Sequence, residues 1–225
     1  MVTPAACTDT PCQASAGVAG ALGWVALGSM VANLCAYVVH IAAGRWWLGT
    51  AEYGEFAVLL SAMLVLAVPS LALQSVVARE VVHGRDGPRL PIITGYCAGV
   101  VVFLTLIAIP VMTAVASTGV AVTAAGVAAA PFLAVIGGGQ GILQGRSEFR
   151  ILGGVLAVVG MLRTVPVIAV LAAGAGPVGA LAAGAAGAAA AAIVVWAAVG
   201  WSGRRDVYRR KLGRRKPGRA ESGSA

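Results

Sequence analysis

Six apolar segments, each long enough to cross a lipid bilayer, dominate this chain of 225 residues. A membrane-spanning helix needs about 20 consecutive, mostly apolar residues. We expect such helices at residues 17–43, 56–77, 90–115, 120–143, 151–173 and 177–201. The composition agrees, because 59% of the residues are hydrophobic and only 11% are charged, which is too little polar surface for a soluble domain. The sequence therefore predicts an all-α protein, a polytopic membrane bundle of six transmembrane helices.

Basic residues predict how the bundle is oriented. Fourteen of the sixteen Lys and Arg residues fall in three places, which are residues 79–89, residues 146–150 and the tail after Trp201. Two apolar segments separate each basic place from the next, so all three should lie on one side of the membrane. Basic connectors stay on the cytoplasmic side. We therefore expect a multi-pass protein of the cell (cytoplasmic) membrane, with both termini in the cytoplasm.

This orientation divides the chain into three parts. Residues 1–16 are expected to form a cytoplasmic N-terminal segment, residues 17–201 the six-helix transmembrane domain, and residues 202–225 a disordered, basic cytoplasmic tail. Nine basic residues lie between Arg204 and Arg219. A basic cluster directly after a membrane span typically binds anionic lipids of the inner leaflet. Nucleic-acid binding is disfavoured, because Tyr208 is the one aromatic residue in the cluster and the cluster forms no recognition fold.

Polar residues recur along one face of the first apolar segment. They are separated by four, four and three positions, which places them on the same side of a helix; they are Ser29, Asn33, Tyr37 and His40. Two interpretations remain open. The residues form hydrogen bonds between helices, or they line a hydrated cavity.

Arg163 lies close to the middle of the fifth segment. An arginine at that depth costs about 2.5 to 3.5 kcal/mol on insertion scales, so it should face protein or water. It either bonds a carbonyl group of a neighbouring helix or binds an anion, because the planar guanidinium suits phosphate. All eight acidic residues lie outside the six segments. Since pumps and antiporters of protons or sodium generally use buried carboxylates, an anionic or neutral cargo is favoured.

Small residues and prolines predict packing and bends. Gly137, Gly141 and Gly145 repeat at four-residue spacing, which allows close approach of another helix. Gln140 and Gln144 flank this stripe and either bond a neighbour or extend the polar surface. Four of the segments contain a proline away from their first residues, where it removes a helix hydrogen bond and tends to bend the axis; these prolines are Pro69, Pro110, Pro131 and Pro166.

Motifs of catalysis are not found in the sequence. It contains no HExxH, CxxC or phosphate-loop pattern and no Ser, His and Asp set. Cys7 and Cys12 lack two further ligands for a metal site. We therefore expect a protein that is not an enzyme and that uses no cofactor and no metal.

Two short motifs resemble a known family. The connector after the first segment has the form LG..EYG, with Leu48, Gly49, Glu52, Tyr53 and Gly54. The connector before the fifth segment has the form LQG-x-x-x-F, with Leu143, Gln144, Gly145 and Phe149, and leads into the helix that contains Arg163. Together with the GAGPVGA turn before the last segment, these motifs resemble bacterial polysaccharide flippases. These are the Wzx-like members of the multidrug/oligosaccharidyl-lipid/polysaccharide exporter superfamily.

The resemblance covers roughly residues 20–200 and implies a function. Such flippases move a polyprenyl-pyrophosphate-linked oligosaccharide from the inner to the outer leaflet by alternating access, through a cavity lined by basic and polar side chains. The candidate substrate-binding residues are Arg163, Ser29, Asn33, Tyr37, His40, Gln140 and Gln144.

Family members have twelve or fourteen helices in two six-helix lobes, so this chain resembles one lobe. A homodimer or a second six-helix lobe would complete the cavity, because transporter halves related by an axis along the membrane normal can be separate chains. Two alternatives remain. The chain is a non-transporting scaffold subunit of a polysaccharide-synthesis complex that acts through its basic tail, or it is a multidrug antiporter, which the missing carboxylates disfavour.

Overall fold

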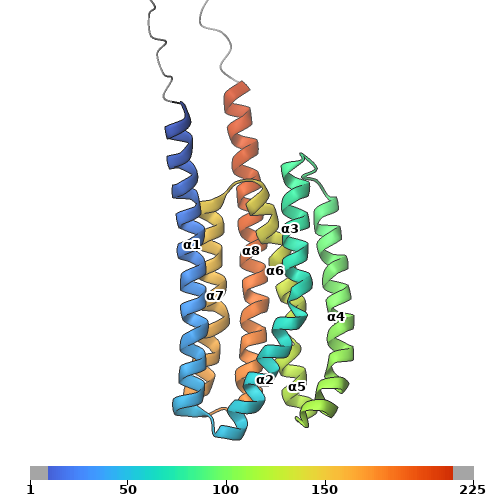
Figure 1. Ribbon diagram of the computed structural model, residues 1–225. Coiled ribbons are helices and arrows are strands. Elements are labelled where there is room, and N and C mark those ends of the chain that lie inside the picture. Colours follow the sequence, from blue (N-terminus) through green and yellow to red (C-terminus); the bar gives the residue numbers. More distant parts are fainter. Residues whose placement is uncertain (1–9, 215–225) are drawn as a thin grey trace, which may run out of the picture.

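The computed structural model describes residues 10–214, and this part of the chain is helical without any strand. The elements, labelled in Figure 1, are α1 (Thr10–Ala42), the π-helical turn η1 (Ala43–Trp47), α2 (Thr50–Leu66), α3 (Val68–Val82), α4 (Arg89–Ala116), α5 (Val120–Val127), α6 (Ala130–Gly145), α7 (Phe149–Ala172) and α8 (Pro177–Arg214).

These elements form six apolar spans, each long enough to cross a membrane, in the chain order expected from the sequence. The second span consists of α2 and α3, and the fourth consists of α5 and α6. The prediction of an all-α membrane bundle with six transmembrane helices is confirmed, and the chain is a multi-pass membrane protein.

Several of the expected boundaries differ from the structure, among them both ends of the second span, which runs from Thr50 to Val82 instead of 56–77. Helix α1 begins at Thr10 rather than near residue 17, and α8 continues past Trp201 to Arg214. The basic tail, expected to be disordered from residue 202, is therefore helical as far as Arg214. Extending an existing helix adds a hydrogen bond for each residue fixed, and Arg and Lys have high helix propensity. Residues 1–9, which include Cys7, and residues 215–225 lie outside the described part.

The prolines interrupt two spans and leave two continuous. Pro69 and Pro131 are each the second residue of a new helix, α3 and α6. A proline is tolerated in the first turn of a helix because its missing N–H group would have no partner there. Pro110 and Pro166 lie inside the continuous helices α4 and α7.

The helices pack as two groups. Helix α1 lies along α7, and α7 lies against α8, whereas α3 and α4 lie against α6. Contacts of α5 and α6 with α8 join the groups. The expected close approach at the glycine stripe is confirmed, because a methyl group at Gly141 would lie 2.6 Å from the Gln74 carbonyl oxygen, and one at Gly145 would lie 2.7 Å from the Ala78 carbonyl oxygen.

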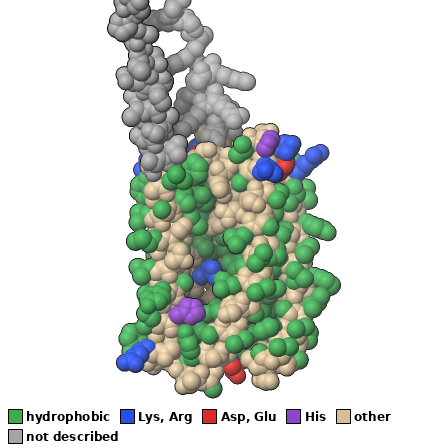
Figure 2. Space-filling model, viewed as in Figure 1, with side chains coloured by type: hydrophobic (Ala, Val, Ile, Leu, Met, Phe, Trp, Pro, Cys, Tyr) green, Lys and Arg blue, Asp and Glu red, His purple; other side chains and the backbone are tan. Residues whose placement is uncertain are grey.

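As expected, the described parts of all three basic places lie at one end of the bundle. Figure 1 shows the α3–α4 connector, the α6–α7 connector and the C-terminal part of α8 at this basic end, and η1 at the opposite end, called the η1 end below. At the basic end, Nε and Nη2 of Arg146 donate hydrogen bonds of 2.8 Å and 3.2 Å to the Asp86 carboxylate, and Nη1 donates one of 3.2 Å to the Val199 carbonyl oxygen. Apolar side chains cover most of the height between the two ends (Figure 2).

Candidate substrate cavity

A cavity of about 600 Å³ lies between the two helix groups. Its walls come from α1 and α7 on one side, from α2, α3 and α6 on the other, and from α5 and α8. The interruptions of the second and fourth spans lie at this level, because Ala67, between α2 and α3, and Ala129, between α5 and α6, both line the cavity. Figure 2 shows the hollow, with a basic side chain inside it and a histidine side chain at its lower edge.

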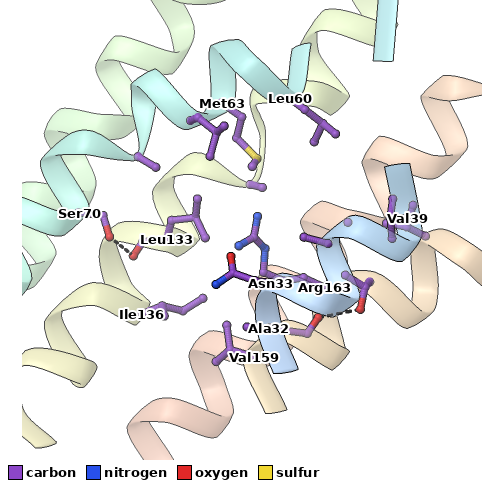
Figure 3. A pocket seen from close by; sticks show the side chains of 18 of the residues that line it. Ala32, Asn33, Val39, Leu60, Met63, Ser70, Leu133, Ile136, Val159 and Arg163 are labelled. Carbon is purple, nitrogen blue, oxygen red and sulfur yellow. Dashed lines mark hydrogen bonds between the residues drawn. The ribbon is translucent and has the colours of Figure 1, made fainter. Parts of the chain in front are cut away.

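Arg163 lines this cavity, and its guanidinium points into it (Figure 3). Helix α8 supports the backbone behind it through Gly187, where a methyl group would lie 3.1 Å from the Cα atom of Arg163. Among the residues that the structure describes, no carbonyl oxygen or carboxylate accepts a hydrogen bond from this guanidinium, and no ion pair involves it. Of the two interpretations of Arg163, a bond to a neighbouring helix is therefore not observed, and the side chain faces a cavity.

The polar stripe of α1 divides between two places. Asn33 and His40 line the cavity, and Figure 3 shows the Asn33 amide next to the Arg163 guanidinium. Ser29 and Tyr37 do not line it. The helical twist of about 100° per residue explains this, since His40 deviates by about 20° from the direction of Asn33, and Ser29 and Tyr37 deviate by about 40° to opposite sides.

Ser29 and Tyr37, the two residues of the stripe that do not line the cavity, have different neighbours. The Asn33 side-chain nitrogen donates a hydrogen bond of 2.9 Å to the Ser29 carbonyl oxygen, within α1. Tyr37 is 64% exposed and lies in a second depression together with Arg45 and Tyr53. Of the two interpretations of the stripe, cavity lining applies to Asn33 and His40, whereas no side chain of the stripe forms a hydrogen bond to another helix among the described residues.

The two glutamines of α6 also differ. Gln140 lines the cavity. Gln144 does not, and its Oε1 accepts a hydrogen bond of 3.2 Å from Nε2 of Gln74 on α3. The sequence left open whether these residues bond a neighbour or extend the polar surface. The structure shows the bond for Gln144 and the cavity position for Gln140.

Sequence reasoning missed three polar residues of the cavity, which are Ser70, Gln74 and Thr164. Ser70 and Gln74 stand four positions apart in an apolar segment, and this spacing was a signal that pointed to one helix face. Ser70 Oγ donates a hydrogen bond of 2.6 Å to the Leu133 carbonyl oxygen, and Thr164 Oγ1 donates one of 2.8 Å to the Gly160 carbonyl oxygen. Both hydroxyl donors are thus used within the protein.

The LG..EYG motif forms the connector at the η1 end and lies outside the cavity. Leu48 is buried, and Glu52 accepts a hydrogen bond of 3.0 Å from the Gly49 backbone N–H at the start of α2. Tyr53 packs against Gly44, where a methyl group would lie 3.1 Å from Tyr53 Cε2. No atom would come within 4 Å of a methyl group at Gly54.

The LQG-x-x-x-F motif fixes the connector at the basic end. Leu143 is fully buried, and Phe149 at the start of α7 packs against the main apolar core. Gly145 gives α3 room to approach, and Gln144 bonds Gln74. Both motifs thus shape the bundle that surrounds the cavity and do not line it.

The ionisable side chains that line the cavity are all basic. Arg163 and His40 are its ionisable lining residues, and the lining contains no aspartate or glutamate. Asn33 and Gln140 add amide groups, and most of the remaining lining is apolar. The residues that the structure describes contain no group of three His, Cys, Asp or Glu side chains able to hold a metal ion. The arrangement is suited to a molecule that carries negative charge and apolar surface.

Comparisons with known proteins place the fold. No protein-family model matches the chain, and no curated protein matches it. A solved structure, described as the outward-facing conformation of a multidrug resistance MATE family transporter of the MOP superfamily, superimposes with a TM-score of 0.57. The chain has a MATE-like fold. The two chains are 18% identical in sequence, so the likeness concerns the fold alone.

The extent of the match shows which part of that fold is present. It covers 78% of this chain and 43% of the MATE transporter. This chain therefore spans less than half of that protein's length and has the MATE-like fold of one helical lobe.

Proposed function

We propose that this chain is half of a membrane transporter and that its cargo is a polyprenyl-pyrophosphate-linked oligosaccharide. The observation that carries the proposal is Arg163, which points into a cavity without an acidic partner among the described residues. A guanidinium binds phosphate oxygens in a bidentate manner, and such charge-assisted hydrogen bonds are among the strongest in proteins. Transport would proceed by alternating access across the cell membrane, without an enzymatic step.

The apolar part of the lining supports a lipid-linked cargo. Leu60, Met63 and Ile136 line the same cavity as Arg163. A pyrophosphate that carries a polyprenyl chain combines negative charge with apolar surface, and this lining offers contacts to both. Asn33 and Gln140 supply hydrogen-bonding groups for sugar hydroxyls.

A second half would complete the transporter. The chain spans 43% of the MATE transporter that it resembles, and transporter halves can be related by an axis along the membrane normal. We propose either a homodimer or a complex with another six-helix lobe. Native mass spectrometry of the gently purified protein, with its bound lipid, measures this stoichiometry directly, and a lipid-free monomer would contradict it.

The proposed orientation places the basic end in the cytoplasm, because positively charged connectors remain on that side. Arg204 and Arg205 are exposed at this end. Attraction to anionic lipids is worth about 1 kcal/mol for each basic residue near the membrane surface. The continuation of α8 leaves the bundle along the helix axis (Figure 1), so Arg204 and Arg205, at its base, would be the basic residues of α8 nearest to the anionic inner leaflet.

Two other functions compete with this one. The solved neighbour is a multidrug resistance transporter, and a mostly apolar cavity is compatible with drug-like cargo. A scaffold subunit that acts through the basic tail would instead tolerate changes at Arg163 and lose function when the residues after Trp201 are removed.

Transport by proteoliposomes tests the proposal. The protein, purified with its bound partners, is reconstituted and assayed for flipping of a fluorescent polyprenyl-pyrophosphate oligosaccharide and, separately, for uptake of a cationic dye. We expect Arg163→Gln to reduce flipping at least tenfold, corresponding to about 1.4 kcal/mol, and Arg163→Lys to retain part of it. Arg150→Gln is the matched control, because Arg150 lies on α7 outside the cavity, over the Trp24 ring. Unchanged flipping in Arg163→Gln, or dye uptake without flipping, would contradict the proposal.

A further inference from the structure

His40 is the residue that two neighbouring cavities share. It lines the 600 Å³ cavity of Arg163. It also lines a shallower depression of about 420 Å³ at the η1 end, together with Tyr37, Ile41, Gly44, Arg45 and Tyr53. His40 therefore stands where the inner cavity meets the surface at the η1 end.

The surrounding helices hold His40 in this place. Its neighbours in sequence, Val39 and Ala42, are buried, which fixes this part of α1 against the bundle. The imidazole ring meets the buried Phe56 ring edge-on, with ring centroids 6.4 Å apart and planes at 68°. The side chain is otherwise exposed. The π-helical turn η1 follows within three residues, and π-helical segments are frequent at functional sites.

The ionisable groups around His40 are cationic or uncharged. Arg163 of α7 lines the inner cavity with it, and Arg45 of η1 lines the outer depression with it. Tyr37 of α1 and Tyr53 of α2 complete that depression. No carboxylate of the described residues lines either cavity; on α2, Glu52 caps Gly49, and Glu55 lines neither. Protonation of His40 would thus add a positive charge between Arg163 and Arg45 that no acidic group neutralises.

We propose that His40 is a proton-binding site that controls how strongly this cavity holds an anion. In its charged form it links Arg163 and Arg45 into a row of positive groups that leads from the inner cavity to the η1 end, and the pyrophosphate of the cargo binds along this row. In its neutral form the row is interrupted. Histidine is suited to this role because its charge changes between about pH 5 and 8. This inference rests on the proposed function, since it assigns a regulator to the same anion site.

Proton binding and anion binding are then linked. A charged His40 raises anion affinity, so the affinity of the site for an anion should depend on pH. The cargo itself keeps its charge over this pH range, because both phosphates of a pyrophosphate diester are strong acids. Any pH dependence of binding therefore originates in the protein.

Binding measurements at two pH values test the inference. The full-length protein in nanodiscs is titrated with a soluble short-chain prenyl-pyrophosphoryl-N-acetylglucosamine at about pH 5.5 and about pH 8, on either side of the histidine range. We expect the wild type to bind about fivefold or more tightly at the lower pH, a typical size for coupling between sites. His40→Gln should bind weakly at both values, and His40→Lys should bind tightly at both. His83→Gln, which changes the second histidine of the chain, on the exposed α3–α4 connector, should match the wild type.

The outcomes separate the inference from the proposed function. A His40→Gln protein that keeps the pH dependence of the wild type would overturn the role of His40 and leave the anion site standing. A His40-dependent pH effect that persists in Arg163→Gln with undiminished affinity would support His40 and contradict Arg163 as the anion ligand. Absence of binding by the wild type at both pH values would overturn the anion site, and the inference with it.

Discussion

Arg146 holds Asp86 through two hydrogen bonds of 2.8 Å and 3.2 Å, across sixty positions of sequence. The same guanidinium reaches the Val199 carbonyl oxygen on α8. One side chain therefore joins the α3–α4 connector, the α6–α7 connector and the last helix at the basic end. This contact crosses between the two helix groups, away from the cavity.

Arg146→Gln should lower the stability of the bundle. Both side chains of the pair are partly exposed, so the loss should be about 1 kcal/mol. Thermal unfolding in nanodiscs measures it as a lower Tm. The control is Arg85→Gln, because Arg85 pairs with Glu80 five residues away and joins no second helix group. Equal losses in both variants would contradict a role for Arg146 in joining distant segments.

Gly141→Ala should destabilise the packing of α3 on α6. The added methyl group would lie 2.6 Å from the Gln74 carbonyl oxygen and 3.0 Å from Val77 Cβ, and such overpacking typically costs about 1 to 3 kcal/mol. Unfolding in urea or heat measures the change. Gly154→Ala on α7 is the matched control, because nothing lies within 4 Å of its added methyl group, and alanine favours a helix over glycine by about 1 kcal/mol. The contact is refuted if Gly141→Ala is as stable as this control.

Gln140→Leu and Gln144→Leu should have different consequences. Gln140 lines the cavity, so its substitution should weaken cargo binding about fivefold, the equivalent of one hydrogen bond of about 1 kcal/mol, with little change in Tm. Gln144 accepts a hydrogen bond from Gln74, so its substitution should lower Tm and leave binding nearly unchanged. Binding titrations and unfolding curves on both variants distinguish the roles. If both substitutions weakened cargo binding equally, the assignment of Gln140, but not Gln144, to the cavity would be contradicted.

Cysteine labelling should reveal the orientation in the membrane. Ser117 follows α4 near the η1 end, and Ser147 lies between α6 and α7 at the basic end. In a background without the four native cysteines, a membrane-impermeant maleimide added to intact cells should label Ser117→Cys and leave Ser147→Cys unlabelled until the membrane is opened. The reverse pattern would place the basic end outside and overturn the proposed topology.

The spans and their common basic end are predictable because hydropathy and charge act locally along the chain. The start of α1 and the end of α8 are not predictable in this way, since both helices extend beyond the apolar residues that identify them. The sequence also does not distinguish Pro69 and Pro131, which begin new helices, from Pro110 and Pro166, which do not. A proline in a helix interior either kinks or breaks the helix, and the residue type alone does not specify which.

The candidate site is predictable to a similar degree. An unpaired arginine in an apolar span had to face protein or water, and Arg163 faces a cavity. Asn33, His40 and Gln140 also reach it. Tyr37 lines the outer depression instead, because a small angular deviation on a helix decides which cavity a side chain meets. Gln144 forms a hydrogen bond with Gln74, which lies seventy positions away in the sequence, so no local pattern predicts this contact.

The interruptions at Ala67 and Ala129 divide the second and fourth spans beside the cavity. On the basic side, α3 and α6 interlock at Gly141, and on the η1 side α2 meets α5 at Gly126, where a methyl group would lie 2.8 Å from Leu59 Cβ. The helices are in close contact within the α3–α6 pair and within the α2–α5 pair, but neither of these two spans is one continuous helix. A tilt of α2 and α5 at these two alanines would change the width of the cavity beside His40, and the contacts of both helices with α4 and α8, which run without interruption past both halves, oppose such a tilt.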